Sequence, residues 1–175
     1  IDTEEDIVFL FLTTHGGSDH HLSFEMPPLA LSQLDPPLLA RMFEESGIKW
    51  KVIVVSACYS GAFVDALKDE NTLIVTASDA LNTSFGCETD SDFTWFSQAY
   101  FDEALRMTRS FVDAFPIARR AVLERERKQG YTPSNPQVHV GEAMRLKLDA
   151  LERRLNSNDP GRPAVHASLR AVLNP

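Results

Sequence analysis

The sequence has 175 residues, a length that most simply corresponds to one domain, or to one domain with an added helix. Acidic residues outnumber basic ones by 25 to 17, and the net charge of −8 argues against a dedicated role in nucleic-acid binding, which requires a basic face. An apolar content of 43% excludes disorder along the whole chain, and no apolar run reaches the roughly 20 residues of a membrane-spanning helix. Two cysteines are too few for a disulfide-stabilised scaffold.

The first predicted element is a strand at residues 7–12, Ile-Val-Phe-Leu-Phe-Leu. A continuous apolar run of this kind is typical of a strand that is buried on both faces of a parallel sheet. The run ends at residues 13–17, Thr-Thr-His-Gly-Gly, where two glycines indicate a turn. A helix is then expected between a cap at Asp35 and a stop at Gly47, with prolines tolerated in its first turn.

Two further strands are predicted at residues 52–55 and 73–76, with a short helix up to about residue 68 between them. Strands that alternate with helices indicate a parallel sheet with right-handed crossovers. The second half is predicted to be helical, apart from a loop at residues 130–136. Its three apolar stripes contain Phe93, Phe96, Tyr100, Ala104 and Met107; Phe111, Phe115, Ala118 and Val122; and Met144, Leu148, Leu151 and Leu155. We expect one domain at residues 1–155 and a polar tail at residues 156–175.

Reactive side chains follow the first two predicted strands. His15 comes after the first strand and Cys58 after the second, and sites in open parallel sheets collect at the carboxyl ends of strands. Cys58 also precedes a predicted helix N-terminus, which favours a thiolate, and His15 can exchange protons with it. The N–H groups of Gly16 and Cys58 are candidates for an oxyanion hole. If the two strands are neighbours, this pattern predicts a Cys–His catalytic pair.

Three ordered blocks resemble the active-site region of legumain-type cysteine peptidases, which share a clan with caspases and gingipains. The first block is residues 8–17, Val-Phe-Leu-Phe-Leu-Thr-Thr-His-Gly-Gly, and the second is residues 54–61, Val-Val-Ser-Ala-Cys-Tyr-Ser-Gly. The third combines residues 76–78, Thr-Ala-Ser, with residues 83–87, Thr-Ser-Phe-Gly-Cys. Caspases show a related Ala-Cys block about 50 residues after their histidine. The resemblance covers residues 7–100.

This resemblance implies an α/β, caspase-like fold, with a mostly parallel sheet flanked by helices, that lacks the family's first strand or two in this sequence. It implies a cysteine endopeptidase in which Cys58 attacks the peptide carbonyl, His15 transfers protons, and an acyl-enzyme is released by water. The loop from Ser84 to Asp92 would form a wall of the pocket for the side chain before the scissile bond. Because Ser56 stands where legumains carry an acidic residue, the family's asparagine preference would be weakened or shifted toward a basic side chain.

The resemblance requires no metal or organic cofactor, and the expected partner is a peptide or protein substrate. A transamidase of the same clan is a close variant, because another amine can replace water. A different class, an α/β-hydrolase-like esterase, would need His139 or His166 as its base, since that fold places the histidine after the nucleophile. A third possibility is a binding domain that retains the peptidase fold without catalysis.

Other polar groups have simpler interpretations. The histidines at positions 20 and 21 lie near His15 and Asp19, but adjacent histidines on a loop rarely converge on one metal ion. Cys87 is expected to be a packed or loop thiol, and a disulfide between Cys58 and Cys87 would block the nucleophile.

Overall fold

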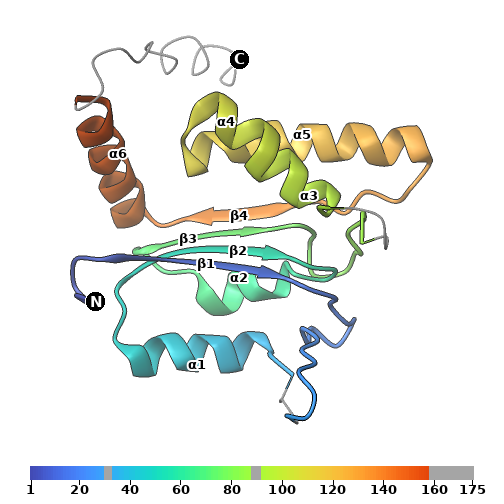
Figure 1. The fold of residues 1–175 in the computed structure, drawn as a ribbon, viewed down its shortest axis with the longest axis horizontal. Coiled ribbons are helices and arrows are strands. Elements are labelled where there is room, and N and C mark those ends of the chain that lie inside the picture. The colour runs from blue at the N-terminus through green and yellow to red at the C-terminus, as the bar shows by residue number, and fades with distance from the viewer. Residues whose placement is uncertain (30–32, 88–91, 158–175) are drawn as a thin grey trace.

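The computed structural model describes residues 1–29, 33–87 and 92–157 of the chain, and Figure 1 shows their arrangement. Four strands form one sheet in the order β1-β2-β3-β4, namely β1 (Ile7–Thr13), β2 (Trp50–Ser56), β3 (Thr72–Thr76) and β4 (Gln137–Val140). The first three strands are parallel, and β4 runs antiparallel to β3. The predicted, mostly parallel sheet is therefore confirmed.

Helices cover both faces of this sheet (Figure 1). One face carries α1 (Pro36–Ser46) and α2 (Ala62–Leu67). The other carries a continuous helical segment, α3 (Trp95–Ser97), η1 (Gln98–Ala104) and α4 (Leu105–Thr108), together with α5 (Phe111–Gln129), while α6 (Glu142–Ser157) stands at one end of the sheet. None of the helices in the described ranges combines the length and apolar character needed to cross a membrane.

The central strands divide the core into two layers by alternation of their side chains. Val52 and Val54 pack toward α5 and η1, whereas Ile53 and Val55 pack toward α1 and α2. All four side chains are almost fully buried, as expected for strands covered on both faces. The same prediction for β1 is wrong, because β1 lies at the edge of the described sheet and its Phe9 and Phe11 side chains are exposed. This sandwich holds the carboxyl ends of β1, β2 and β3 at one edge of the molecule.

The first helix begins and ends as the sequence predicts. The Asp35 carboxylate accepts a hydrogen bond of 2.7 Å from the Leu38 N–H, and Gly47 closes the helix in the left-handed conformation with φ of 67°. The prolines lie in the first turn, where their missing N–H groups have no intrahelical partner to lose.

The last strand was not anticipated from the sequence pattern. β4 has four residues, of which Val138 and Val140 alternate with polar side chains, too short a run to distinguish a strand from a loop. It forms because its backbone pairs with β3, Leu73 lying opposite Val140 and Thr76 opposite Gln137. The helix that follows continues to Ser157, and residues 158–175 of the expected polar tail lie outside the described residues.

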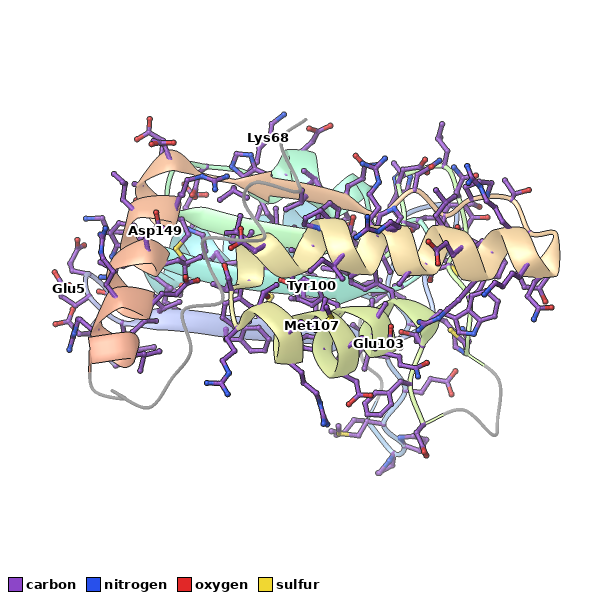
Figure 2. The ribbon with its side chains drawn as sticks, turned by 90° about the horizontal axis from the view of Figure 1, so that it is seen from above. Glu5, Lys68, Tyr100, Glu103, Met107 and Asp149 are labelled. Carbon is purple, nitrogen blue, oxygen red and sulfur yellow. The ribbon has the colours of Figure 1, made fainter. Side chains whose placement is uncertain are left out.

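The apolar stripe predicted to end at Met107 is wrong at both ends. Phe96, Tyr100 and Ala104 are buried, but Phe93 is exposed and the Met107 side chain is 55% exposed. Phe93 precedes the helical segment, which begins at Trp95 after its cap at Thr94. At the other end, the wider winding of the π-helical turn η1 spaces the inward side chains four residues apart instead of 3.6. Thr108 takes the next inward place; Figure 2 labels Tyr100 and Met107 on this segment.

The stripe of α5 is confirmed, and that of α6 only in its first half. Phe115, Ala118 and Val122 are buried, and the buried Glu126 extends their row. In α6, Met144 and Leu148 are buried, whereas Leu151 and Leu155 are exposed. The difference arises because α6 extends away from the sheet beyond its first turns (Figure 1).

Tyr100 provides a test of this core. Its side chain is fully buried and its hydroxyl donates a hydrogen bond of 2.7 Å to the Phe111 carbonyl, and burial raises the pKa of Tyr100 well above its ordinary value. We expect Tyr100→Phe to lower the free energy of unfolding by about 1 kcal/mol at neutral pH, measured by urea denaturation. Above about pH 10 the unfolded tyrosine ionises first, so the wild-type chain should lose stability faster with rising pH than Tyr100→Phe.

Tyr131→Phe is the matched control, because the Tyr131 side chain is exposed. This change should alter neither the stability at neutral pH nor its dependence on alkaline pH. Equal effects of the two substitutions would show that the Tyr100 hydroxyl contributes nothing specific.

Candidate active site

The candidate site lies where β1 and β2 end. These strands are parallel neighbours in register, with Thr13 opposite Ser56, and the Thr14 N–H donates a further hydrogen bond of 3.3 Å to the Ser56 carbonyl. His15 and Cys58 each follow their strand by two residues, so the pairing brings these two segments out of the sheet side by side. The two strands are therefore neighbours, as the predicted Cys–His pair requires.

Gly16 packs directly against the backbone of Cys58. A Cβ atom at position 16 would lie 2.1 Å from the Cys58 carbonyl oxygen, so no larger residue fits here without displacing one of the two segments. Neither the Gly16 nor the Cys58 N–H donates a hydrogen bond to another residue within the described ranges. An oxyanion hole requires N–H groups that lie close together and are free to donate to the substrate oxygen.

The Cys58 sulfur is in contact with the backbone of Ser84, on the loop that follows β3. The Ser84 N–H donates to Sγ at 3.3 Å, and the Cys58 thiol donates to the Ser84 carbonyl at 3.4 Å. The Ser84 hydroxyl lies 3.8 Å from the sulfur. Helix α2, which was expected close behind the cysteine, begins only at Ala62. The hydrogen-bond partners of the sulfur among the described residues are all atoms of Ser84.

The turn after Cys58 has an unusual backbone. Tyr59 adopts a left-handed conformation with φ of 57°, which disfavours a bulky side chain. Its N–H donates a hydrogen bond of 2.9 Å to the Asn82 carbonyl. One residue on, Ser60 exchanges hydrogen bonds with the buried Ser78 through N–H and hydroxyl groups. The loop after β3 thus supports the loop that carries the cysteine.

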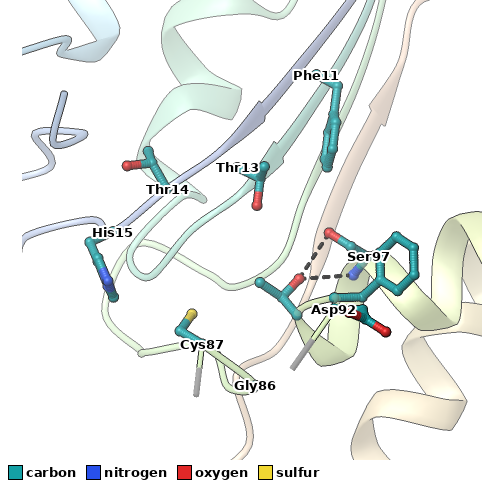
Figure 3. Close-up of a pocket in the computed structure, with 10 residues that line it drawn as sticks. Phe11, Thr13, Thr14, His15, Gly86, Cys87, Asp92 and Ser97 are labelled. Atoms are coloured by element: carbon teal, nitrogen blue, oxygen red, sulfur yellow. Dashed lines mark hydrogen bonds between the residues drawn. The ribbon is translucent and has the colours of Figure 1, made fainter. Parts of the chain in front are cut away.

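A pocket of about 360 Å³ opens beside His15 (Figure 3). Its lining consists of Phe11, Thr13, Thr14, His15, Gly86, Cys87, Asp92, Phe93, Thr94 and Ser97. His15 lies on the β1 side, and Cys87 faces it from the loop after β3 (Figure 3). Of the wall expected from Ser84 to Asp92, Gly86, Cys87 and Asp92 line the pocket, and residues 88–91 lie outside the described residues. Ser84, expected in this wall, and Cys58 are not among the lining residues.

Three hydroxyl groups form a ring beneath this pocket. Thr94 donates to Ser97 at 2.8 Å, Ser97 donates to Ser56 at 3.0 Å, and 2.7 Å separates the Ser56 and Thr94 oxygens. Because Thr94 and Ser97 use their protons in the first two bonds, Ser56 supplies the proton of the third. Ser56 is buried and reaches the pocket only through Thr94 and Ser97, which the sequence analysis did not single out.

Cys87 was expected to be a packed or loop thiol, and its exposed side chain lines the pocket. Partial burial of the sulfur, and second the negative charge of Cys58, raise the pKa of Cys87 above its ordinary value.

The other histidines have partners outside this pocket. The His20 ring nitrogen lies 3.1 Å from the Ala80 carbonyl oxygen, and His21 lies between the carboxylates of Asp19 and Asp35 at 3.3 and 3.7 Å. His139 lies on β4 and contacts the Asp69 carbonyl at 2.9 Å, in the loop that enters β3. That position is at the opposite end of β3 from Cys58, which disfavours the esterase arrangement. His166 lies outside the described residues.

The class to which this chain belongs follows from its fold and sequence. The fold is caspase-like: it matches a crystal structure of caspase-1 from Spodoptera frugiperda with a TM-score of 0.54 and 17% identity, over 79% of this chain and 61% of the caspase chain. The model of the Peptidase C13 family matches residues 1–146. The chain therefore belongs to the Peptidase C13 family, the legumain-like cysteine peptidases of the caspase clan. The search of curated proteins found no significant match.

The two thiols of the site should differ in reactivity. We expect iodoacetamide at about pH 7 to modify Cys58 roughly tenfold faster than Cys87, whose raised pKa keeps it as the unreactive thiol. Peptide mapping by mass spectrometry after timed labelling measures the two rates separately.

Single-cysteine variants provide the controls for this labelling. In Cys58→Ala the repulsion from the Cys58 charge is gone, so the pKa of Cys87 should fall and its labelling should accelerate. Cys87→Ser should leave the labelling of Cys58 unchanged. Equal labelling of both cysteines in the wild-type chain at pH 7 would contradict this difference.

Proposed function

We propose that this chain is a cysteine endopeptidase in which Cys58 is the nucleophile and His15 the proton-transfer group. The observation that supports the proposal is the registered pairing of β1 and β2, since His15 and Cys58 each follow one of these strands by two residues and His15 lines an open pocket. Membership of the Peptidase C13 family supports the same chemistry. This chain spans 61% of the length of the caspase chain that it matches. The substrates and partners of the whole protein are therefore also proposed here.

The proposed reaction has two steps. The Cys58 thiolate attacks the scissile carbonyl carbon, the carbonyl oxygen becomes an oxyanion, and the N–H groups of Gly16 and Cys58 hold it. His15 then gives a proton to the leaving amine, and the C–N bond breaks to leave a thioester. In the second step His15 takes a proton from water, the hydroxide attacks the thioester, and the Cys58 thiolate leaves. An amine in place of water would give the transamidation variant.

We propose further that the pocket selects a side chain that donates hydrogen bonds. Each proton of the hydroxyl ring is used within the ring, so Ser97 offers the pocket a lone pair and no proton. The Thr94 oxygen already accepts from the Ser56 hydroxyl and from the Ser97 N–H. Thr14 likewise donates its proton away from the pocket, to the Ser23 carbonyl, and Asp92 adds a carboxylate at the rim. Such a lining favours asparagine, lysine or arginine before the scissile bond, and it repels aspartate and glutamate.

The first test concerns the catalytic pair. Cys58→Ala and His15→Ala should each lower kcat/KM for a peptide substrate by roughly a thousandfold or more, because either change removes an essential group from one linked mechanism. Circular dichroism should show an unchanged fold, since both side chains lie at the surface edge of the sheet and carry little packing.

His139→Ala is the matched histidine control and should retain wild-type turnover. A wild-type rate of turnover in Cys58→Ala would contradict the proposed mechanism. Loss of activity in His139→Ala but not in His15→Ala would instead support the esterase arrangement.

The second test concerns the residue before the scissile bond. Peptides that differ only at that residue should rank asparagine, lysine and arginine at least about tenfold in kcat/KM above leucine, aspartate and glutamate. Asp92→Ala should reduce the differences in kcat/KM among these peptides, because it removes the carboxylate from the pocket. Asp113→Ala on α5 is the control, since it removes a carboxylate outside the pocket. A preference for leucine or phenylalanine, or an unchanged ranking in Asp92→Ala, would remove the pocket assignment while leaving the catalytic pair in place.

A further inference from the structure

A second carboxylate, outside the pocket, organises the loop that contacts Cys58. Asp79 lies just after β3 and accepts hydrogen bonds from the Leu81 N–H at 2.8 Å and from the Asn82 amide, whose nitrogen lies 2.9 and 2.8 Å from its two oxygens. The Asn135 amide, from the loop before β4, donates to the same carboxylate at 3.1 Å. The Asp79 N–H donates at 2.9 Å to the Ser134 carbonyl. One side chain therefore ties two separate loops together.

The residues that Asp79 holds are those that contact the nucleophile segment. The Asn82 carbonyl accepts the N–H of Tyr59, the residue directly after Cys58, and Ser84, two residues further along, contacts the sulfur. Gly61 packs so closely that a Cβ atom there would lie 2.6 Å from the Asp79 Cα atom. The left-handed backbone of Tyr59 needs such support, because a non-glycine residue is strained in this conformation and keeps it only where the surroundings hold it.

The carboxylate is suited to this task because it remains ionised. Partial burial, the largest single effect, opposes its charge, but the N–H donors from Leu81, Asn82 and Asn135 together hold the pKa of Asp79 below its ordinary value. Hydrogen bonds to a charged acceptor are stronger than those between neutral groups.

We infer that Asp79 is a positioning residue for Cys58, which acts through Asn82 on the Tyr59 peptide and through the same loop on the Ser84 N–H. The inference rests on the proposed function, because it concerns how the nucleophile of that reaction is oriented. Asp79 touches neither the pocket lining nor the sulfur, so its effect must pass through the backbone of this loop.

The same loop has a second anchor, which allows a specific test. Beyond Ser84, the Phe85 carbonyl accepts a hydrogen bond of 3.1 Å from the Trp95 N–H, and the Phe85 ring stacks on Tyr131 with 4.5 Å between ring centroids. Gly86, with φ of 88°, lies against the Trp95 side chain. This anchor holds the pocket wall. Loss of Asp79 should therefore disturb the nucleophile and leave the pocket wall in place.

The experiment compares Asp79→Ala and Asp79→Asn with the wild-type chain on one peptide substrate. We expect Asp79→Ala to lower kcat about ten- to a hundredfold with KM changed less than about twofold, the size expected for a displaced reacting group. Asp79→Asn keeps one acceptor oxygen and should recover part of kcat. Phe85→Leu should show the opposite pattern, a raised KM with kcat largely retained.

Asp69→Asn is the control for general destabilisation. Asp69 is a loop carboxylate at the other end of β3, where it accepts from the Asn71 N–H at 2.8 Å and pairs with Lys51 at 3.0 Å. Its loss should lower the unfolding temperature without lowering kcat. The inference is overturned if Asp79→Ala keeps kcat within about twofold of the wild-type value, or if this variant lowers kcat/KM by raising KM instead of lowering kcat. It is also overturned if Asp69→Asn lowers kcat as much as Asp79→Ala does.

The rate of Cys58 labelling by iodoacetamide separates this inference from the proposed function. Asp79→Ala should slow that labelling by a factor similar to its effect on kcat, since both depend on the same sulfur. If the wild-type chain cleaves no peptide, the endopeptidase proposal fails, and labelling alone decides the role of Asp79: slower labelling supports it, and unchanged labelling overturns it.

Discussion

The parallel pairing of β1 with β2 is the constraint on which the rest of this site depends. Because Thr13 lies opposite Ser56, the two strands end level, and the residues two positions beyond them leave the sheet together. A shift of one residue in this register would turn every side chain of β1 to the other face. The pairing runs along the whole of β1, from Ile7 to Thr13, so the geometry of the candidate site depends on the entire strand. Gly16 extends this closeness past the strands, where only a hydrogen atom fits against the Cys58 carbonyl.

The loop after β3 completes the site, and it does so with two independent attachments. Asp79 and Ser78 connect its first part to the turn that follows Cys58, while the aromatic stack of Phe85, Trp95 and Tyr131 holds its second part. Ser84 lies between the two and contacts the sulfur. A loop built in this way can present a contact to the nucleophile on one side and a wall to the pocket on the other. If the chain acts by the proposed mechanism, this division would allow the reaction and the selection of the substrate side chain to be altered separately.

Much of this architecture could be predicted from local patterns. The continuous apolar runs identified β1, β2 and β3, and Asp35 and Gly47 marked the ends of α1, because these signals act within a few residues. The short β4 could not be found in this way, since its existence depends on pairing with a distant strand. At the site, His15 and Cys58 could be placed by strand-end reasoning. The ring of Ser56, Thr94 and Ser97 could not, because single hydroxyl residues carry no periodic signal and meet only after folding.

The π-helical turn η1 has a consequence for how this chain can change in length. Such a turn is equivalent to one extra residue inserted into an α-helix, here accommodated between α3 and α4. Removal of one residue from η1 would therefore restore regular α-helical winding while α4 keeps its present faces, with Ala104 and Thr108 still directed inward. Removal of one residue from a regular α-helix such as α5 would instead rotate every residue that follows by about 100°. A deletion in η1 is thus accommodated by loss of the wider turn, whereas a deletion in the first half of α5 would move the buried Val122 to a new face.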